Sequence, residues 1–430
     1  MSIPLDRLYH FINNIANEIY GDDIVIIRSY PYGSKKLEDL VFLLDLSYID
    51  KMSGLQVYCH DQEPLDYDAM SLRRPDIKLT AFQILRNRVT TLNTNSFPNI
   101  RWHTNINNLA LLLHSEKRSA DLEQYQNNTF IPVYYWSHAI MALDWFRFAE
   151  HEKFTKNVKK VFLIYNRAWS GTREYRLKFL DLLISQQLIN QCQTSANFIE
   201  PELGIHYTQH QFKNPQWQPN NQLENHSTIN LAHSHASADF DTADYQSTDV
   251  EVILETLFDD GRLHLTEKSL RPIACAQPFI LVGTQGSLEY LRGYGFKTYN
   301  TIWNEEYDLI KDPRERMSAI IDLMQSIAAW TPEIRAQKMQ AAQIIADYNR
   351  QYFFSATFFN HIMLELRNNF KSAFEIFNAE NTCQIWIDRW KILLASKEML
   401  DFINNGNFDL SLDEINYMTA QAKQTTNCVK

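Results

Sequence analysis

The chain has 430 residues, of which 45% are hydrophobic and 21% are charged, and its formal net charge is −10 at pH 7. These values are typical of a globular protein with two or three domains and argue against a chain that is disordered throughout. The excess of negative charge opposes broad electrostatic capture of nucleic acid or of an anionic membrane. A small or neutral ligand is therefore the simpler expectation.

Targeting and redox features of the sequence favour a protein that stays where it is made. No apolar run reaches the roughly 20 residues that cross a bilayer, and the N-terminal stretch carries acidic and amide side chains. The five cysteines are scattered and show no CxxC spacing, so neither a disulfide framework nor a cysteine zinc site is indicated. We expect a cytoplasmic protein without a membrane span.

The first part of the chain alternates between strand-like and helix-like segments. Apolar runs that read as buried strands occupy residues 24–27, 41–46 and 55–59. Segments with helical spacing occupy residues 70–93 and 107–114. A short aromatic run and a helix follow from Ile131. The alternation predicts an α/β domain over residues 1–155.

A second α/β domain is predicted over residues 156–345, followed by a helical segment over 346–430. Val161 to Tyr165 predict a strand, and the leucines that recur from Leu177 predict the helix after it. This order is typical of nucleotide-binding α/β units. The next part of the chain is less uniform. Residues 204–247 are polar and expected to be irregular, 250–257 fit either strand or helix, 278–283 predict a strand, and the pattern is almost wholly helical from 318 onward.

The clearest chemical pattern combines Glu255 with the triplet Thr266, Glu267 and Lys268, ahead of the glycine-ended strand at 278–283. A leaving diphosphate requires fixed cations or oriented amides where negative charge develops, and a carboxylate suits the hydroxyls of a ribose. The positive end of a helix that begins near Lys268 would add to this attraction. The pattern therefore indicates a site for a nucleotide with a diphosphate.

The start of that helix has two candidate N-caps, Thr266 and Ser269. Pro272 lies close behind them and would strain a helix that began at the earlier residue. The two starts remain alternatives at the level of sequence. On its own, a Thr-Glu-Lys triplet is more often a solvated helix surface than a site.

The segment LETLFDDGRLHLTEKSLRPIACAQPFILVG, which begins at Leu254, resembles the donor-binding motif of the α1,3-fucosyltransferases. The resemblance implies a GT-B-like α/β fold, in which two Rossmann-like domains face a cleft and C-terminal helices pack back against them. It also implies a ribose contact for Glu267, a diphosphate contact for Lys268 and a donor-sugar contact for Glu255. Thr256 stands where the family has asparagine.

Two further segments carry the same resemblance. The helix that begins near Arg176 is similar to the family's helix whose arginine neutralises the diphosphate, so Arg176 is the first candidate for this role and Arg173 the second. LQVYCHDQEP, from Leu55, resembles the turn that presents the catalytic base. Glu63 fits this role best, and Asp61 is its alternative.

These patterns predict a glycosyltransferase that moves a sugar from a nucleotide-diphosphate donor, such as a GDP-fucose-like compound, to a hydroxyl of a glycan or another acceptor. The resemblance implies an inverting reaction without a required metal or cofactor. Two alternatives stay open. In the first, the protein is a glycosyltransferase whose acceptor is a nucleic-acid base, which the net charge disfavours. In the second, the protein binds a glycan or nucleotide without turnover.

Possible metal-binding patterns are weaker. The motifs concerned are His233-x-His235, Asp66-x-Asp68 and Asp239-x-Asp241. Histidines in polar segments are more often exposed loop residues, and neither Asp-x-Asp motif directly follows a clear strand. No metal site is predicted.

Overall fold

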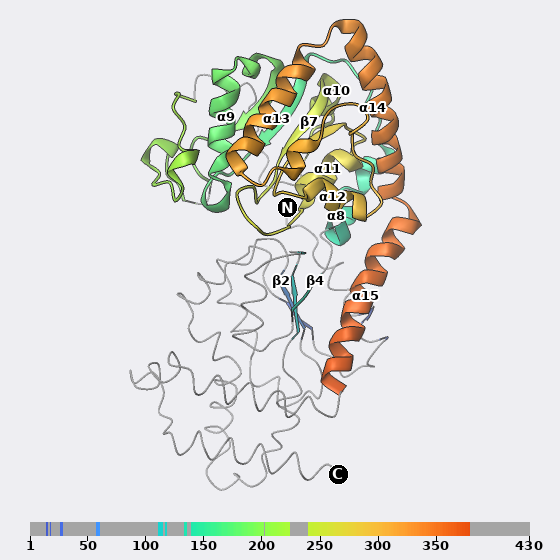
Figure 1. The fold of residues 1–430 in the computed structure, drawn as a ribbon. Coiled ribbons are helices and arrows are strands. Elements are labelled where there is room, and N and C mark those ends of the chain that lie inside the picture. The colour runs from blue at the N-terminus through green and yellow to red at the C-terminus, as the bar shows by residue number, and fades with distance from the viewer. Residues whose placement is uncertain are drawn as a thin grey trace, which may run out of the picture. The chain divides into compact units, whose positions relative to one another are not determined.

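A computed structural model describes residues 139–223, except 202, and residues 240–378. It also describes short segments nearer the N-terminus, at residues 14, 15, 18, 26–28, 57–60, 111–114, 117 and 133–135. The chain divides into two compact units (Figure 1). One comprises residues 1–4, 116–119 and 137–364, and the other comprises 5–115, 120–136 and 365–430. The first unit therefore includes residues on both sides of the predicted 156–345 domain.

The N-terminal sheet consists of four parallel strands in the order β1-β2-β3-β4. The strands are β1 (Ile26–Arg28), β2 (Val57–His60), β3 (Leu111–His114) and β4 (Val133–Tyr135). Strands were expected near β1 and β2, but the helical prediction for 107–114 is wrong at Leu111–His114. A short apolar run fits a strand buried on both faces as well as it fits a helix, so periodicity alone does not separate them. The predicted elements at 41–46 and 70–93 lie outside the described residues.

A second sheet forms the centre of the larger described region, and it too has four parallel strands, in the order β6-β5-β7-β8. The strands are β5 (Lys160–Asn166), β6 (Cys192–Ala196), β7 (Thr248–Leu254) and β8 (Phe279–Val282). Because β5 is paired with β6 on one side and with β7 on the other, the order of the chain reverses at β5. The protein is thus of the α/β class, with parallel sheets.

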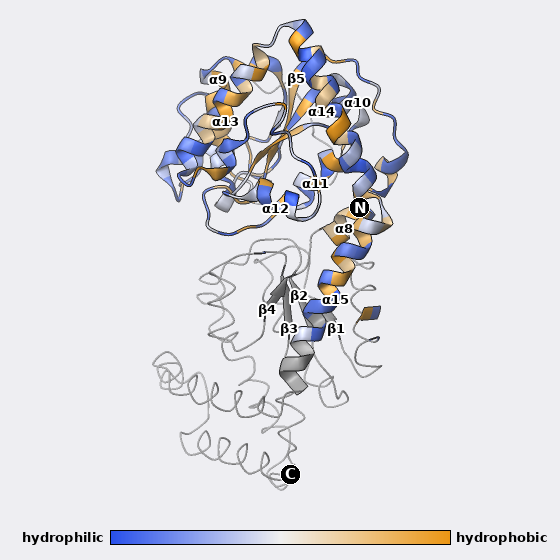
Figure 2. Ribbon diagram, turned by 45° about the vertical axis from the view of Figure 1, so that its right-hand side comes forward, coloured by the Kyte–Doolittle hydropathy of each residue, from blue (hydrophilic) through white to orange (hydrophobic). Residues whose placement is uncertain are grey.

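Helices cover both faces of this second sheet. Figure 1 shows α9 and α13 on one side of β7 and α10, α11 and α14 on the other, and Figure 2 shows the same arrangement after rotation. The α-helices are α8 (Ala139–Trp145), α9 (Tyr175–Ser185), α10 (Thr242–Ser247), α11 (Glu267–Ala274), α12 (Ser287–Gly293), α13 (Pro313–Ala328), α14 (Pro332–Phe353) and α15 (Ala356–Asn378). The 3-10 helices are η3 (Arg147–His151), η4 (Gly171–Arg173), η5 (Leu188–Gln191), η6 (Tyr207–Gln209), η7 (Pro215–Trp217) and η9 (Glu306–Leu309). Among the described helices, none combines the length and the apolar character that a membrane span requires.

The core of this region lies between the sheet and its helices. Every residue of β7 and β8 is buried. Figure 2 shows hydrophobic colouring concentrated on the central strands, with hydrophilic residues on the outward helix faces. Strands that are covered on both faces read as continuous apolar runs, which is why β5 and β8 were visible in the sequence.

Candidate functional site

The predicted donor-site residues lie where the strands of the second sheet end. β5 ends at Asn166 and β7 ends at Leu254, and the helices that follow, α9 and α11, start at the same edge of the sheet. Ligands of parallel α/β sheets bind at this carboxyl edge, at the point where the strand order reverses. In this sheet that point lies between β5 and β7.

Arg176 joins the ends of these two strands from inside the protein. Its Nη1 donates to the carbonyl of Ala168 at 2.7 Å, and its Nη2 donates to the carbonyls of Leu254 and Glu255 at 2.8 and 2.9 Å. Its Nε is buried without a partner, and the residue is only 2% exposed. These bonds go to carbonyl oxygens rather than to a carboxylate. The guanidinium therefore brings positive charge to the point between β5 and β7 where the strand order reverses.

Arg173 lies at the end of η4, just before α9, and is half-buried. Burial is the main reason why the pKa of the Arg176 guanidinium is lowered, and the positive charge of Arg173 lowers it further. The two guanidinium groups are therefore close enough to interact. Arg173 is the more accessible of the two.

The carboxylate of Glu255 is fully buried. Its Oε1 accepts hydrogen bonds from the Thr266 amide at 3.0 Å and from the Ser269 hydroxyl at 2.6 Å. Its Oε2 accepts from the Thr256 amide at 3.0 Å and from the Thr266 hydroxyl at 2.8 Å. The side chain therefore ties the end of β7 to the start of α11.

Thr266 is the N-cap of α11, which begins at Glu267. Its hydroxyl accepts from the Lys268 amide, so the earlier of the two predicted helix starts is correct. Pro272 lies inside this helix, two residues before its end at Ala274, where it offers no amide hydrogen to the carbonyl four residues earlier. Ser269, the other candidate cap, points its hydroxyl to Glu255 instead.

The ammonium group of Lys268 is partly accessible at this helix start, with 16% of its side chain exposed. It pairs with Glu267 at 2.8 Å and lies 3.4 Å from the hydroxyls of both Thr256 and Thr266. Lys268 of α11 and Arg176 of α9 thus contact the same two-residue segment, Glu255–Thr256. The structure brings together the predicted donor-site cations.

Two carboxylates whose partners the sequence did not reveal shape the loop after β5. Glu200 is fully buried and accepts from the amides of Trp169 and Ser170 at 2.8 and 2.9 Å. Glu174 accepts from the amides of Lys213 and Asn214 and lies 2.8 Å from the ring of His210. Their partners lie some 30 to 40 positions away in the chain, so no local signal could have found them.

The candidate bases, Asp61 and Glu63, lie outside the described residues. The strand predicted over 55–59 corresponds to β2, which ends at His60, directly before Asp61. His233 and His235 also lie outside the described residues, as do the first Asp-x-Asp motif and Asp239. Asp241 caps α10 by accepting from the amide of Ala243 at 2.8 Å.

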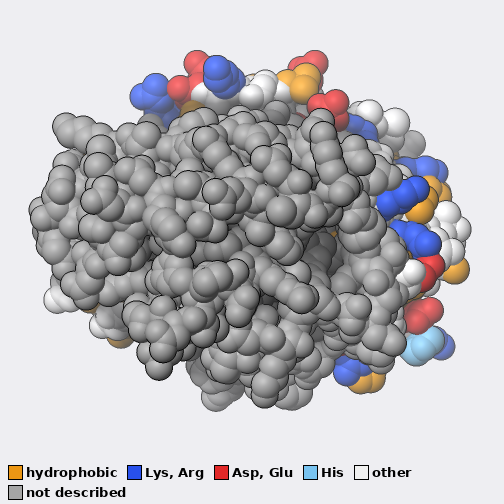
Figure 3. Space-filling model, turned by 90° about the horizontal axis from the view of Figure 1, so that it is seen from below, with side chains coloured by type: hydrophobic (Ala, Val, Ile, Leu, Met, Phe, Trp, Pro, Cys, Tyr) orange, Lys and Arg blue, Asp and Glu red, His pale blue; other side chains and the backbone are white. Residues whose placement is uncertain are grey.

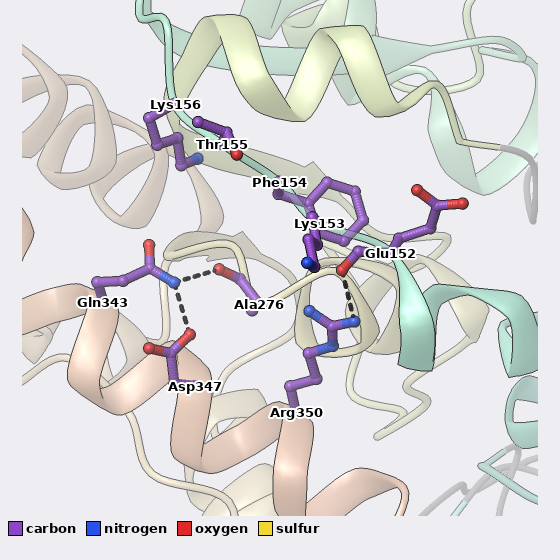
Figure 4. Close-up of a pocket in the computed structure, with 9 residues that line it drawn as sticks. All are labelled: Glu152, Lys153, Phe154, Thr155, Lys156, Ala276, Gln343, Asp347 and Arg350. Atoms are coloured by element: carbon purple, nitrogen blue, oxygen red, sulfur yellow. Dashed lines mark hydrogen bonds between the residues drawn. The ribbon is translucent and has the colours of Figure 1, made fainter.

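A cavity of about 330 Å³ lies at the opposite, amino edge of the second sheet. It is lined by the connector that precedes β5, by Ala276 ahead of β8, and by α14 (Figure 4). Its polar groups bond to the protein itself: Gln343 Nε2 donates to the Ala276 carbonyl at 2.9 Å and to Asp347 at 2.8 Å. The predicted donor residues do not line this cavity.

Neither the surface charge nor the possible metal ligands of the described residues indicate a further site. Figure 3 shows basic and acidic side chains interspersed along the visible rim of described residues. Within the part of the chain that the structure describes, no three His, Cys, Asp or Glu side chains gather as they would around a metal ion.

Comparisons with known proteins add no support to the resemblance to α1,3-fucosyltransferases, which is based on the sequence motifs alone. No protein-family model, curated protein or solved structure matches the chain. What the residues establish is an α/β protein whose parallel sheet carries Arg176, Arg173 and Lys268 at its carboxyl edge.

Proposed function

We propose that the protein is a glycosyltransferase of GT-B architecture that uses a nucleotide-diphosphate sugar as donor. The observation that carries the proposal is the meeting of Lys268 and Arg176 at Glu255–Thr256, on the carboxyl edge of a parallel sheet. Ligands of such sheets bind at this edge, and two helices begin there. Glu255, the triplet at 266–268 and the glycine-ended strand also follow one another in the order of the α1,3-fucosyltransferase donor motif.

The departing diphosphate is the group that these cations would stabilise. Negative charge develops on it as the bond to the sugar breaks, and cations that are already in place need no reorganisation at that moment. Lys268 and Arg173, which are partly accessible, would contact the phosphates, while Arg176 would act from the buried side. Glu267 would hold the ribose next to Lys268.

The acceptor side of the reaction is proposed from the resemblance alone. Glu63, or Asp61 as its alternative, would take the proton from an acceptor hydroxyl as the sugar is transferred. Proton removal by a positioned carboxylate contributes roughly 10²- to 10⁴-fold to the rate. A single displacement inverts the anomeric centre, with Lys and Arg neutralising the leaving group.

Thermal-shift screening against GDP, UDP, ADP and their sugars tests the proposal, because a ligand that binds only the folded state raises the melting temperature. We expect one nucleotide family to raise it, and Lys268→Ala to lose most of that shift. Lys159→Ala, an exposed lysine ahead of β5, is the matched control and should keep the shift. An unchanged shift in Lys268→Ala would remove this lysine from the site.

Turnover separates the enzyme from the competing functions. Release of free nucleoside diphosphate in the presence of acceptors is expected from the enzyme, whereas nucleotide binding without release would support a non-catalytic binding protein. A salt-sensitive gel shift with DNA or RNA would favour a nucleic-acid acceptor.

A further inference from the structure

Both the backbone carbonyl and the side-chain carboxylate of Glu255 accept hydrogen bonds from the protein itself. Its carbonyl accepts from the Tyr175 hydroxyl at 2.6 Å and from Arg176 at 2.9 Å, while its carboxylate accepts from four donors. The backbone of Glu255 is therefore fixed by α9, which follows β5, and its side chain is fixed by the segment that follows β7.

The carboxylate has no free position for a sugar hydroxyl. Each of its oxygens already accepts two hydrogen bonds, one from an amide and one from a hydroxyl. A carboxylate offers about four such positions in all. The side chain is also fully buried, so a ligand in the site would meet its neighbours rather than Glu255 itself.

Those neighbours border the Lys268 ammonium. Glu255 binds the hydroxyl of Thr266 and the amide of Thr256, and the hydroxyls of both threonines lie 3.4 Å from Lys268 Nζ. Ser269, its remaining partner, is the residue after Lys268. The carboxylate thus fixes Thr266 and Ser269, on either side of the lysine in sequence, together with the Thr266 hydroxyl and the Thr256 backbone beside its ammonium group.

We infer that Glu255 is a positioning residue, which holds the first turn of α11 and with it Lys268 in place for the diphosphate, and does not touch the transferred sugar. The inference rests on the proposed function. It replaces the donor-sugar contact that the family resemblance implies for Glu255.

The test compares ligands that differ only in the sugar. Isothermal titration of Glu255→Gln with GDP, UDP and ADP and with the corresponding nucleotide sugars is expected to show the same loss for both forms of the nucleotide that the protein binds, roughly 10-fold or more. A loss confined to the nucleotide sugar would mean that Glu255 contacts the sugar, and it would overturn the inference.

Ser269→Ala is the matched variant, since it removes one of the four donors and leaves the carboxylate in place. We expect a smaller loss with the same equality between nucleotide and nucleotide sugar. The double variant should lose less than the sum of the two single losses, because both changes act on one hydrogen bond. Additive losses would contradict a shared role, and Ser269→Ala carries the comparison if Glu255→Gln does not fold.

Hydrogen exchange distinguishes failure of this inference from failure of the proposed function. If the wild-type protein binds none of the nucleotides, the proposed function fails. The amides of residues 266–269 still report on Glu255, because they should exchange faster in Glu255→Gln and Ser269→Ala than in the wild type. Unchanged exchange in both variants would overturn the positioning role.

Discussion

At the scale of single residues, one buried ion pair links a helix to the second sheet. Arg271 of α11 donates to Glu251 of β7 at 2.5 Å, with 5% and 0% of the two side chains exposed. The hydroxyl of Tyr245 donates to the same carboxylate at 2.6 Å and accepts from Arg271 Nε at 3.1 Å. This triad joins α11 to α10 and to β7, about one helical turn after Lys268.

Removing Arg271 leaves the buried charge of Glu251 uncompensated. We expect Arg271→Met to lower the free energy of unfolding by about 3 to 5 kcal/mol, measured by urea denaturation. Adding Glu251→Gln should cost less than the sum of the two single changes, since the unpaired carboxylate is then gone. Arg314→Met, at the exposed pair with Asp312, is the control and should change stability little. A small effect of Arg271→Met would show that water reaches Glu251.

Asp308 provides a pH-dependent contribution to stability. Burial raises the pKa of this carboxyl above its usual range, although it accepts from the Leu288 amide. A raised pKa in the folded state means that the contribution is fully present below the unfolded pKa and is lost as the pH rises through the folded value. Relative to Asp308→Asn, the wild type should therefore gain stability as the pH falls from 7 towards 4. Urea denaturation across this range checks the sign, and a pH-independent difference would contradict it.

At the scale of elements, the polar segment after β6 is held against the sheet by a few specific contacts. Glu174, just ahead of α9, binds the amides of Lys213 and Asn214. Trp217 donates its indole hydrogen to Asp259 at 2.5 Å, in the loop between β7 and α11. The described residues 203–223 are thus irregular apart from η6 and η7, as predicted, and they are attached to the two loops that follow β5 and β7. The prediction of irregular structure over 204–247 is wrong at Thr242–Ser247, which form the helix α10.

Loss of the Glu174 charge should loosen this segment before it unfolds the domain. We expect Glu174→Gln to increase proteolytic cleavage within residues 203–223 and to cost about 1 to 3 kcal/mol, because a buried acceptor is replaced in part by a donor. Limited proteolysis followed by mass spectrometry measures the first effect. Glu289→Gln, on the exposed face of α12, should leave the cleavage pattern unchanged. Equal cleavage in both variants would assign the segment's order to other contacts.

At the scale of the whole molecule, the two described sheets are both parallel, and the class of the protein follows from them. The carboxyl edge of the second sheet gathers Arg173, Arg176 and Lys268, although the net charge of the chain is −10. Under the proposed function these cations would meet a small anionic donor, and the negative net charge disfavours a long polyanion. This is the feature that the donor-binding experiments address.

By itself, the sequence determined the α/β class, the strands β5 and β8 and the helix α9, because continuous apolar runs and helical spacing are local signals. It left Thr266 and Ser269 as alternative N-caps of α11, a choice that the structure decided in favour of Thr266. It did not reveal β6, whose residues CQTSA are polar or small, or the strand at Leu111–His114, whose short apolar run suits either state. Only the tertiary structure decided that Arg176 is buried and that all positions of the Glu255 carboxylate are occupied. The donors to that carboxylate include residues 11 and 14 positions later in the chain, and strand and loop must fold back before they meet.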